Sequence, residues 1–176
     1  MKKKFLRTVI SNLKPKVTNL FLFYNAEKLR ALPLPPHYVL RIFDTNKKTG
    51  FKAIDNRKTE NNICYAVFDN EKLVHTSWIF KKKFVTRQLG YKNAFTIGPC
   101  ETIESHRGRG IYPAVLSAIQ RDYPNAKFVM FAKVSNDPSV NGIRKAGFQK
   151  TSRFKMVKLF GLKFAIMNKR LKAVNT

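Results

Sequence analysis

The chain has 176 residues, of which 44% are hydrophobic, so it is long and apolar enough to bury a core and is not a disordered tail. Its formal net charge is +25, which sets 35 Lys and Arg against 10 Asp and Glu. The acids are unevenly spread, because none precedes Glu27 and none follows Asp137. A solvated basic surface is the simplest explanation, but this distribution favours a polyanionic partner, which is a nucleotide cofactor, a nucleic acid or an anionic membrane.

The cysteines and the hydropathy exclude several classes of protein. Cys64 and Cys100 lie in apolar, strand-like patterns and are expected to be buried thiols. Two cysteines offer neither a disulfide framework nor a zinc site, and we predict no metal site. No apolar run approaches the roughly 20 residues that span a bilayer. Residues 1–13 lack the apolar core and cleavage site of a signal peptide, so we expect a cytoplasmic protein.

The first predicted element is a basic amphipathic segment at residues 1–15. Its apolar side chains share one helix face: Phe5, Leu6, Val9, Ile10 and Leu13. Lysines and Arg7 lie on the opposite face, and Pro15 ends the segment. Packing against the chain's own domain is the preferred interpretation, and a helix lying on an anionic membrane surface is the alternative.

The next elements are mainly strands. Short strands are predicted at 20–24 and 38–44, separated by a connector at 32–36 that contains three prolines. A single helical turn is expected at 52–57. Strands at 62–69 and 72–80 are separated by Asn70 and Glu71, which is the spacing of an antiparallel hairpin. Lysines 81–83 at the end of this hairpin are expected to be an exposed charge run.

The second half of the chain alternates strands and helices. A strand at 94–102 leads to a helix at 111–120, and the near-continuous apolar run 127–134 predicts a buried central strand. Asp137 is expected to cap a helix that ends at Gly147, and strands at 148–160 and 162–169 are joined at Gly161. We find no internal repeat and no domain boundary, so residues 1–176 are expected to form one mixed α/β domain with helices covering its sheet.

The turn before the helix at 111–120 has the features of a phosphate site. It reads Ser105-His106-Arg107-Gly108-Arg109-Gly110 and directly follows a strand. The two glycines let the backbone approach a ligand, and the N-terminus of the helix offers unpaired N–H groups and a positive dipole end. An anion, most naturally a phosphate, is therefore expected to bind at this turn.

Two motifs in the correct order resemble the GNAT superfamily of N-acetyltransferases. The first is Arg107-Gly108-Arg109-Gly110-Ile111 followed by an amphipathic helix. The second is Asn136-Asp137-Pro138-Ser139 with Arg144-Lys145-Ala146-Gly147-Phe148. This resemblance covers roughly residues 60–168. It implies a mixed, mostly antiparallel central sheet with helices on both faces, and transfer of an acetyl group from acetyl-CoA to a primary amine without a covalent enzyme intermediate.

The resemblance also implies which residues bind acetyl-CoA. Its pyrophosphate would lie on the N–H groups of the turn: Arg107, Gly108, Arg109, Gly110 and Ile111. Its pantetheine arm would pair with the backbone of the preceding strand, from Glu101 through Thr102 and Ile103 to Glu104. Asn136 and Ser139, at the end of the neighbouring strand, would hold the arm from the other side.

Two positions depart from the family's pattern. Ser105 stands where the family has glutamine or arginine, which removes a long polar side chain but leaves the turn's N–H groups. Ile143 stands where many members have the tyrosine that protonates the departing thiolate. Ser139 and Tyr112 are the nearest residues in the sequence that carry a replacement hydroxyl group.

The amine must lose a proton near the thioester, and a carboxylate or an imidazole could accept it. Glu101 and His75 are the candidates, although a surface ion pair for Glu101 and a satisfied strand histidine for His75 are equally good interpretations. His106 and His37 are expected to be structural, and so is Cys100, because direct transfer needs no cysteine nucleophile.

The acceptor is less sharply predicted. His75-x-Ser77 together with the 97–102 segment resembles a bacterial subset of the family linked to surface polysaccharides, which implies an amino sugar carried on a nucleotide or lipid diphosphate. One alternative is a protein or peptide N-acetyltransferase. Another is a basic nucleic-acid-binding module, but the sequence has no recognition motif for a specific nucleic acid. The oligomeric state is left open.

Overall fold

The computed structural model describes residues 15–25, 31–44, 47–57, 62–81, 84–159 and 162–167. The predicted helix at 2–13 lies outside these residues. The described strands form one sheet: β1 (Lys16–Asn25), β2 (Tyr38–Phe43), β3 (Asn62–Asp69), β4 (Lys72–Phe80), β5 (Phe95–Thr102), β6 (Phe128–Lys133), β7 (Phe148–Leu159) and β8 (Leu162–Met167). The helices are α2 (Lys52–Asp55), α3 (Phe84–Gln88), α4 (Ile111–Asp122) and α5 (Asp137–Lys145), with a 3₁₀ turn at Glu104–His106.

The sheet is mixed and mostly antiparallel, as predicted. Its strand order is β2-β3-β4-β5-β6-β1-β7-β8, and only the β5–β6 pair is parallel among the described pairs. The β3–β4 hairpin has the predicted bounds, with Asn70 at a φ of 52° in its turn. The first strand is longer than the predicted 20–24, because pairing with β7 extends it back to Lys16, where the sequence has no apolar alternation.

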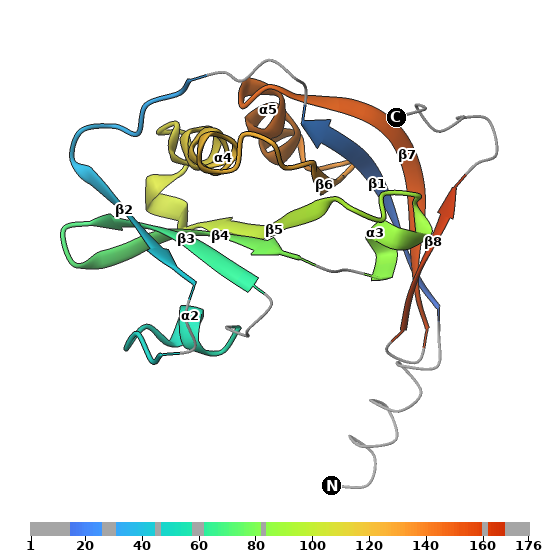
Figure 1. The fold of residues 1–176 in the computed structure, drawn as a ribbon, viewed down its shortest axis with the longest axis horizontal. Helices are drawn as coiled ribbons and strands as arrows, with labels where there is room; N and C mark the ends of the chain where they lie inside the picture. Colours follow the sequence, from blue (N-terminus) through green and yellow to red (C-terminus); the bar gives the residue numbers. More distant parts are fainter. Residues whose placement is uncertain are drawn as a thin grey trace, which may run out of the picture.

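Helices cover both faces of the sheet, which confirms the predicted architecture (Figure 1). On one face α4 packs its apolar stripe on the sheet through Ile111, Val115 and Ile119. On the other face α2 contributes Ile54 to a cluster around Trp78, while α3 contributes Val85 and Leu89 to a separate cluster. No helix in the described part of the chain is long and apolar enough to cross a membrane.

One helix was not predicted, and one cap was predicted at the wrong residue. Helix α3 was not predicted, because five residues are too few to show a helical repeat and the segment follows a lysine run. The N-cap of α5 is Asn136 rather than Asp137. The Asn136 Oδ1 accepts a hydrogen bond from the Ser139 N–H at 3.2 Å, and Asp137 lies inside the first turn. Gly147, with a φ of 91°, follows the end of α5 as predicted.

The parallel pair β5–β6 separates part of the way along its length. The two strands pair only at Phe95–Phe128, Thr96–Val129 and Ile97–Met130. Beyond these pairs β5 stays with β4 and β6 stays with β1, so their facing edges diverge. The diverging ends lead into the N-termini of α4 and α5, which places both sequence motifs around one opening.

Candidate functional site

A cleft of about 920 Å³ opens where β5 and β6 separate. It is lined by the ends of β4 and β5, the turn before α4, and the first turns of α4 and α5. Of the predicted site residues, all except Glu104 line it: His75, Glu101, Thr102, Ile103, Arg107, Gly108, Arg109, Gly110, Ile111, Asn136 and Ser139. The fold therefore brings residues from four separate segments of the chain to one cavity.

The turn before α4 presents bare backbone to the cleft. Gly108 and Gly110 have φ values of 76° and 78°, in the left-handed region that glycine adopts without strain. The Arg107 N–H donates to the Glu104 carbonyl at 3.1 Å. Among the hydrogen bonds of the described residues, none uses the N–H groups of residues 108–111. These four donors at a helix N-terminus are suited to an anion.

The arginines of this turn are held by the protein. The Arg107 Nε donates to the Thr102 carbonyl at 3.2 Å, and the Arg109 Nη1 donates to the Tyr38 hydroxyl at 3.4 Å. Both contacts leave positive charge beside the exposed N–H groups. The local potential therefore favours an anion more strongly than the helix end would by itself.

His106 anchors the turn to the β3–β4 hairpin. Its Nε2 lies 3.1 Å from the Asp69 Oδ2, its Nδ1 lies 2.9 Å from the Ser105 Oγ, and the side chain is almost fully buried. Ser105, one of the departures from the family's pattern, therefore has a structural contact. The geometry agrees with the prediction that His106 is structural.

His75 lies at the centre of a buried polar cluster on the α4 side of β4 and β5. Its Nδ1 is 2.7 Å from the Thr102 Oγ1, and its Nε2 is 2.7 Å from the Ser77 Oγ. Burial lowers the pKa of His75 to about 3, because the charged imidazolium would lose its hydration there. The ring is therefore neutral at physiological pH, and both its nitrogens are engaged.

Tyr112, in the first turn of α4, extends this cluster toward α5. It hydrogen-bonds with Ser139 and with Cys100, so the two hydroxyls named as replacements for the missing tyrosine lie next to each other. Burial raises the pKa of Tyr112 well above its usual value. Burial also raises the pKa of Cys100 to about 11, which keeps the thiol protonated and agrees with a packing role.

Gly142 makes room for the Tyr112 ring. A Cβ at Gly142 would lie 2.6 Å from the Tyr112 Cδ1, closer than real contacts allow. Ile143, at the position of the family's tyrosine, is fully buried in the core instead. The sequence gives a weak indication that a tyrosine from α4 replaces the family's tyrosine on α5, because Gly142 interrupts the helix directly before Ile143. No nearby residue in the sequence links Gly142 to Tyr112.

Glu101 faces the opposite side of the sheet from His75. Neighbouring residues of a strand alternate between faces, so Cys100 and Thr102 lie beside His75 while Glu101 points toward α2. Its Oε1 is 3.4 Å from the Arg57 Nη1, and 66% of its side chain is exposed. Sequence reasoning missed Arg57, which is far from Glu101 in the chain. The described residues hold no group of three or more side chains suited to bind a metal.

The fold has solved relatives, although no family model and no curated protein matches this sequence. A putative acetyltransferase of the GNAT family from Novosphingobium aromaticivorans matches with a TM-score of 0.58 at 12% identity, covering 80% of this chain and 63% of that one. A GCN5-related N-acetyltransferase-like protein from Streptococcus suis matches with a TM-score of 0.56 at 9% identity, covering 89% and 66%. A GNAT-family acetyltransferase from Colwellia psychrerythraea matches with a TM-score of 0.52 at 16% identity, covering 93% and 61%.

These likenesses establish that the chain has the GNAT fold. The chain spans less than two thirds of the length of each of these three solved structures. The matches at these identities concern the backbone fold.

Proposed function

We propose that this protein is an N-acetyltransferase that moves an acetyl group from acetyl-CoA to a primary amine by direct attack. The observation that carries the proposal is the turn at residues 107–110. The N–H groups of residues 108–111, at the N-terminus of α4, open onto the same cleft as the separated edge of β5. A ligand with a diphosphate at one end and amide groups along its length matches both features.

On the donor side, the N–H groups of residues 108–111 bind the pyrophosphate, and Arg107 and Arg109 add positive charge. The Arg107 N–H is already bonded to Glu104, so it is not among the donors we assign. The edge of β5 from Glu101 to Ile103 pairs with the pantetheine amides. Asn136 uses its Oδ1 to cap α5, which leaves its amide nitrogen for the ligand.

On the leaving-group side, the Tyr112 hydroxyl donates a hydrogen bond to the departing sulfur. Its raised pKa keeps the hydroxyl protonated over the working pH range, so it retains a proton to donate. Ser139 orients this hydroxyl. Stabilising a thiolate through a hydrogen bond requires less of the protein than full protonation, because a thiol with a pKa of roughly 8.5 is already a good leaving group.

On the acceptor side, we favour Glu101 over His75 as the base. A base with a pKa of about 3 and two engaged nitrogens accepts a proton poorly from an amine. Glu101 lines the cleft and is largely exposed beside Arg57, so it takes the proton directly or through a water while Arg57 contacts its Oε1. His75 instead joins Ser77 on β4 to Thr102 on β5 and so fixes the strand edge that receives the donor.

The acceptor we propose is an amino sugar carried on a nucleotide or lipid diphosphate, acylated in the cytoplasm for a surface glycan. The sequence motifs around His75 and residues 97–102 and the net charge of +25 support it, because a diphosphate-linked substrate is an anion. Peripheral contact of residues 2–13 with an anionic membrane would place the enzyme near a lipid-linked substrate. An acidic peptide is the alternative acceptor.

A shape-matched pair of variants that differ in charge tests the donor site. Gly110→Asp places a carboxylate where we expect phosphate, whereas Gly110→Asn has the same shape and tolerates the same left-handed φ without the charge. We expect acetyl-CoA to raise the melting temperature of the wild type and of Gly110→Asn, and not of Gly110→Asp. An absent shift in the wild type, or equal shifts in both variants, would contradict the proposal.

The acceptor is then identified by mass spectrometry of the products formed from a panel of nucleotide-linked amino sugars and acidic peptides. Acetylation of an amino sugar alone supports the proposed acceptor. Acetylation of peptides alone would replace it with the alternative while leaving the donor site intact.

A further inference from the structure

The end of the ribbon formed by β1, β7 and β8 carries three lysines side by side. In the strand register, Lys16 lies opposite Lys158, and Lys158 lies opposite Lys163. All three side chains are exposed, on the face of the ribbon that carries α3. Like charges directly opposite each other across strands destabilise a sheet, so this row is unfavourable unless an anion neutralises it.

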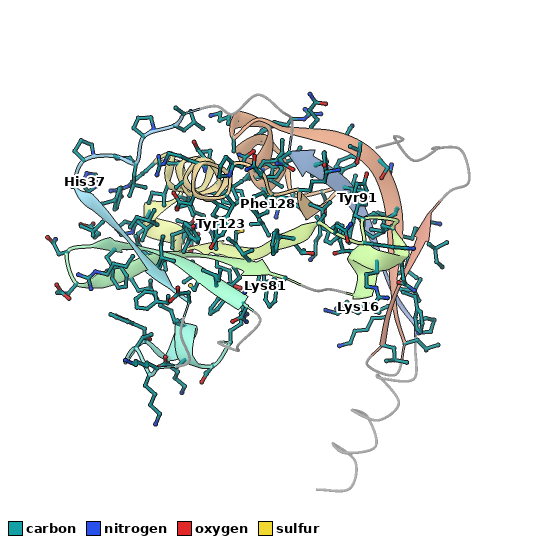
Figure 2. The ribbon with its side chains drawn as sticks, viewed as in Figure 1. Lys16, His37, Lys81, Tyr91, Tyr123 and Phe128 are labelled. Carbon is teal, nitrogen blue, oxygen red and sulfur yellow. The ribbon has the colours of Figure 1, made fainter. Side chains whose placement is uncertain are left out.

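The opposite face of the same ribbon end is apolar and exposed. Val17, Val157 and Phe164 form one row across the three strands, and Leu159 pairs with Leu162 in the next row. The exposed fractions are 54% for Val17, 62% for Leu162 and 38% for Phe164. We call residues 16–17, 157–159 and 162–164 the ribbon tip. Figure 1 shows it at the far end of these strands from α4 and α5, and Figure 2 labels Lys16 there.

The described surroundings of the ribbon tip carry positive charge and no acidic residue, which favours an anionic partner. Strands β1, β6, β7 and β8 and helix α3 contain no Asp or Glu. A second copy of the chain would bring a second basic ribbon against the first. Residues 1–15 contain lysines and no acid, so they offer the three lysines no counter-charge either. A partner that is anionic and also accepts apolar side chains would neutralise the lysine face and cover the apolar face of the ribbon tip.

We propose that the ribbon tip is a docking surface for an anionic lipid bilayer. Entering the headgroup layer end-on puts both faces of the ribbon in the interface. The three lysines then contact lipid phosphates, with their aliphatic stems along the apolar boundary, and Val17, Leu162 and Phe164 reach toward the acyl chains. This contact is formed by folded strands and is separate from any contribution of residues 2–13.

Docking by the tip leaves the cleft open. None of the residues that line the cleft belongs to β1, β7 or β8. The membrane contact is therefore independent of the proposed acetyl transfer, and it is measured without any acyl-CoA.

The test is sedimentation of the full-length protein with vesicles of phosphatidylcholine, with and without phosphatidylglycerol. The variant Lys16→Gln/Lys158→Gln/Lys163→Gln, called the row variant, removes the charges of the three aligned lysines. The matched control Lys52→Gln/Lys92→Gln/Lys127→Gln removes the same charge from exposed lysines elsewhere. At roughly 1 kcal/mol per lysine, the row variant should partition onto anionic vesicles about 100-fold more weakly, and the control should lose only a few-fold.

A second pair of variants tests the apolar face at about 0.5 M salt, where charge attraction is screened. Leu162→Ser/Phe164→Ser should lose roughly tenfold in residual binding, whereas Val39→Ser/Ile42→Ser, which alters exposed residues of β2, should not. Because the lysines repel one another, the row variant should melt no lower than the wild type, so lost binding cannot be attributed to unfolding.

Three results would overturn the proposal. One is unchanged vesicle binding by the row variant. Another is an equal loss in both lysine variants, which would show that only net charge matters. The third is binding of a short DNA duplex that exceeds vesicle binding and is lost with the same lysines, which would make the tip a nucleic-acid surface.

Discussion

His75 is 1% exposed and lies between two hydroxyl groups, with the Thr102 Oγ1 and the Ser77 Oγ each 2.7 Å from a ring nitrogen. The hydroxyls satisfy the neutral ring without supplying a counter-charge. Desolvation therefore dominates and depresses the pKa of the imidazole to about 3. A histidine held this way contributes to strand registration at the cleft, and its protonation opposes folding.

This geometry predicts a pH dependence of stability. Between pH 6.5, the ordinary pKa, and about 3, the folded pKa, the unfolded chain binds a proton at His75 that the folded chain does not. Stability from this residue is therefore lost as the pH falls through that window, by up to ~1.4 kcal/mol per pH unit. When the free energy of unfolding is measured with urea at several pH values, its slope against pH in this window should be shallower for His75→Gln than for the wild type.

His37→Gln is the matched control, because His37 is exposed and its replacement should leave the slope unchanged. Equal slopes of the free energy of unfolding against pH for the wild type and both variants would show that His75 is protonated in the folded protein as readily as in the unfolded chain.

At the residue scale the sequence predicts much of the cleft but not its internal contacts. The glycines at 108 and 110 are recognisable because a glycine-containing turn before a helix is a local pattern, whereas Asn136 was singled out by the family's second motif and not as the N-cap of α5. That Glu101 and His75 face opposite sides of the sheet follows from the register between β4 and β5. Register depends on how distant strands pair, so a single sequence pattern does not specify it.

A close contact between the Tyr112 ring and Gly142 couples helices α4 and α5. The Tyr112 ring occupies the space that any side chain at Gly142 would fill. Both helices were predicted from capping and periodicity, but their contact was not, since it depends on how the two helices pack. A glycine inside a helix is ordinarily unfavourable by about 1 kcal/mol relative to alanine. The packing of the Tyr112 ring against Gly142 explains why this position has no side chain.

A double-mutant cycle tests this coupling. Gly142→Ala should destabilise the protein by about 1–3 kcal/mol, because the new methyl group displaces the half-buried Tyr112 ring, which outweighs the better helix propensity. With Tyr112→Ala already present, the same substitution should be neutral or stabilise by up to ~1 kcal/mol. Urea unfolding of the four proteins measures the coupling free energy. A stabilising effect of Gly142→Ala in both backgrounds would show that the contact is not tight.

For the whole molecule, net charge is the main electrostatic feature. A formal charge of +25 on one domain produces self-repulsion that destabilises the compact state. The described ion pairs are few, and most of their partners are largely exposed, so they offset little of it. The chain is therefore expected to depend on counter-ions or on an anionic partner for part of its stability.

Raising NaCl from about 0.05 M to about 0.5 M should increase the melting temperature by several degrees, because the added ions screen this repulsion. Calorimetry or circular dichroism measures the shift. The variant Lys52→Gln/Lys92→Gln/Lys127→Gln should respond less, since it carries less charge. A melting temperature that stays flat or falls with salt would mean that attractive pairs outweigh the excess of lysine.

The fold class and the β3–β4 hairpin were predictable because they depend on short-range patterns and on two motifs in order. The position of β1 was not. Nothing in residues 16–25 indicates that they pair with both β6 and β7, since the partners lie more than a hundred residues further along the chain. Helix α3 was missed for the opposite reason, being too short to produce a pattern.

The central position of β1 has a consequence for synthesis of the protein. Its apolar residues Leu22 and Phe23 emerge from the ribosome on the order of ten seconds before their partners at 129–133 and 148–158. During that interval the first strand has no ladder to join, and the two parts of the sheet that it will connect do not yet exist. Strand β1 therefore has no partner until β6 is made, and the nascent chain exposes two core side chains during that interval.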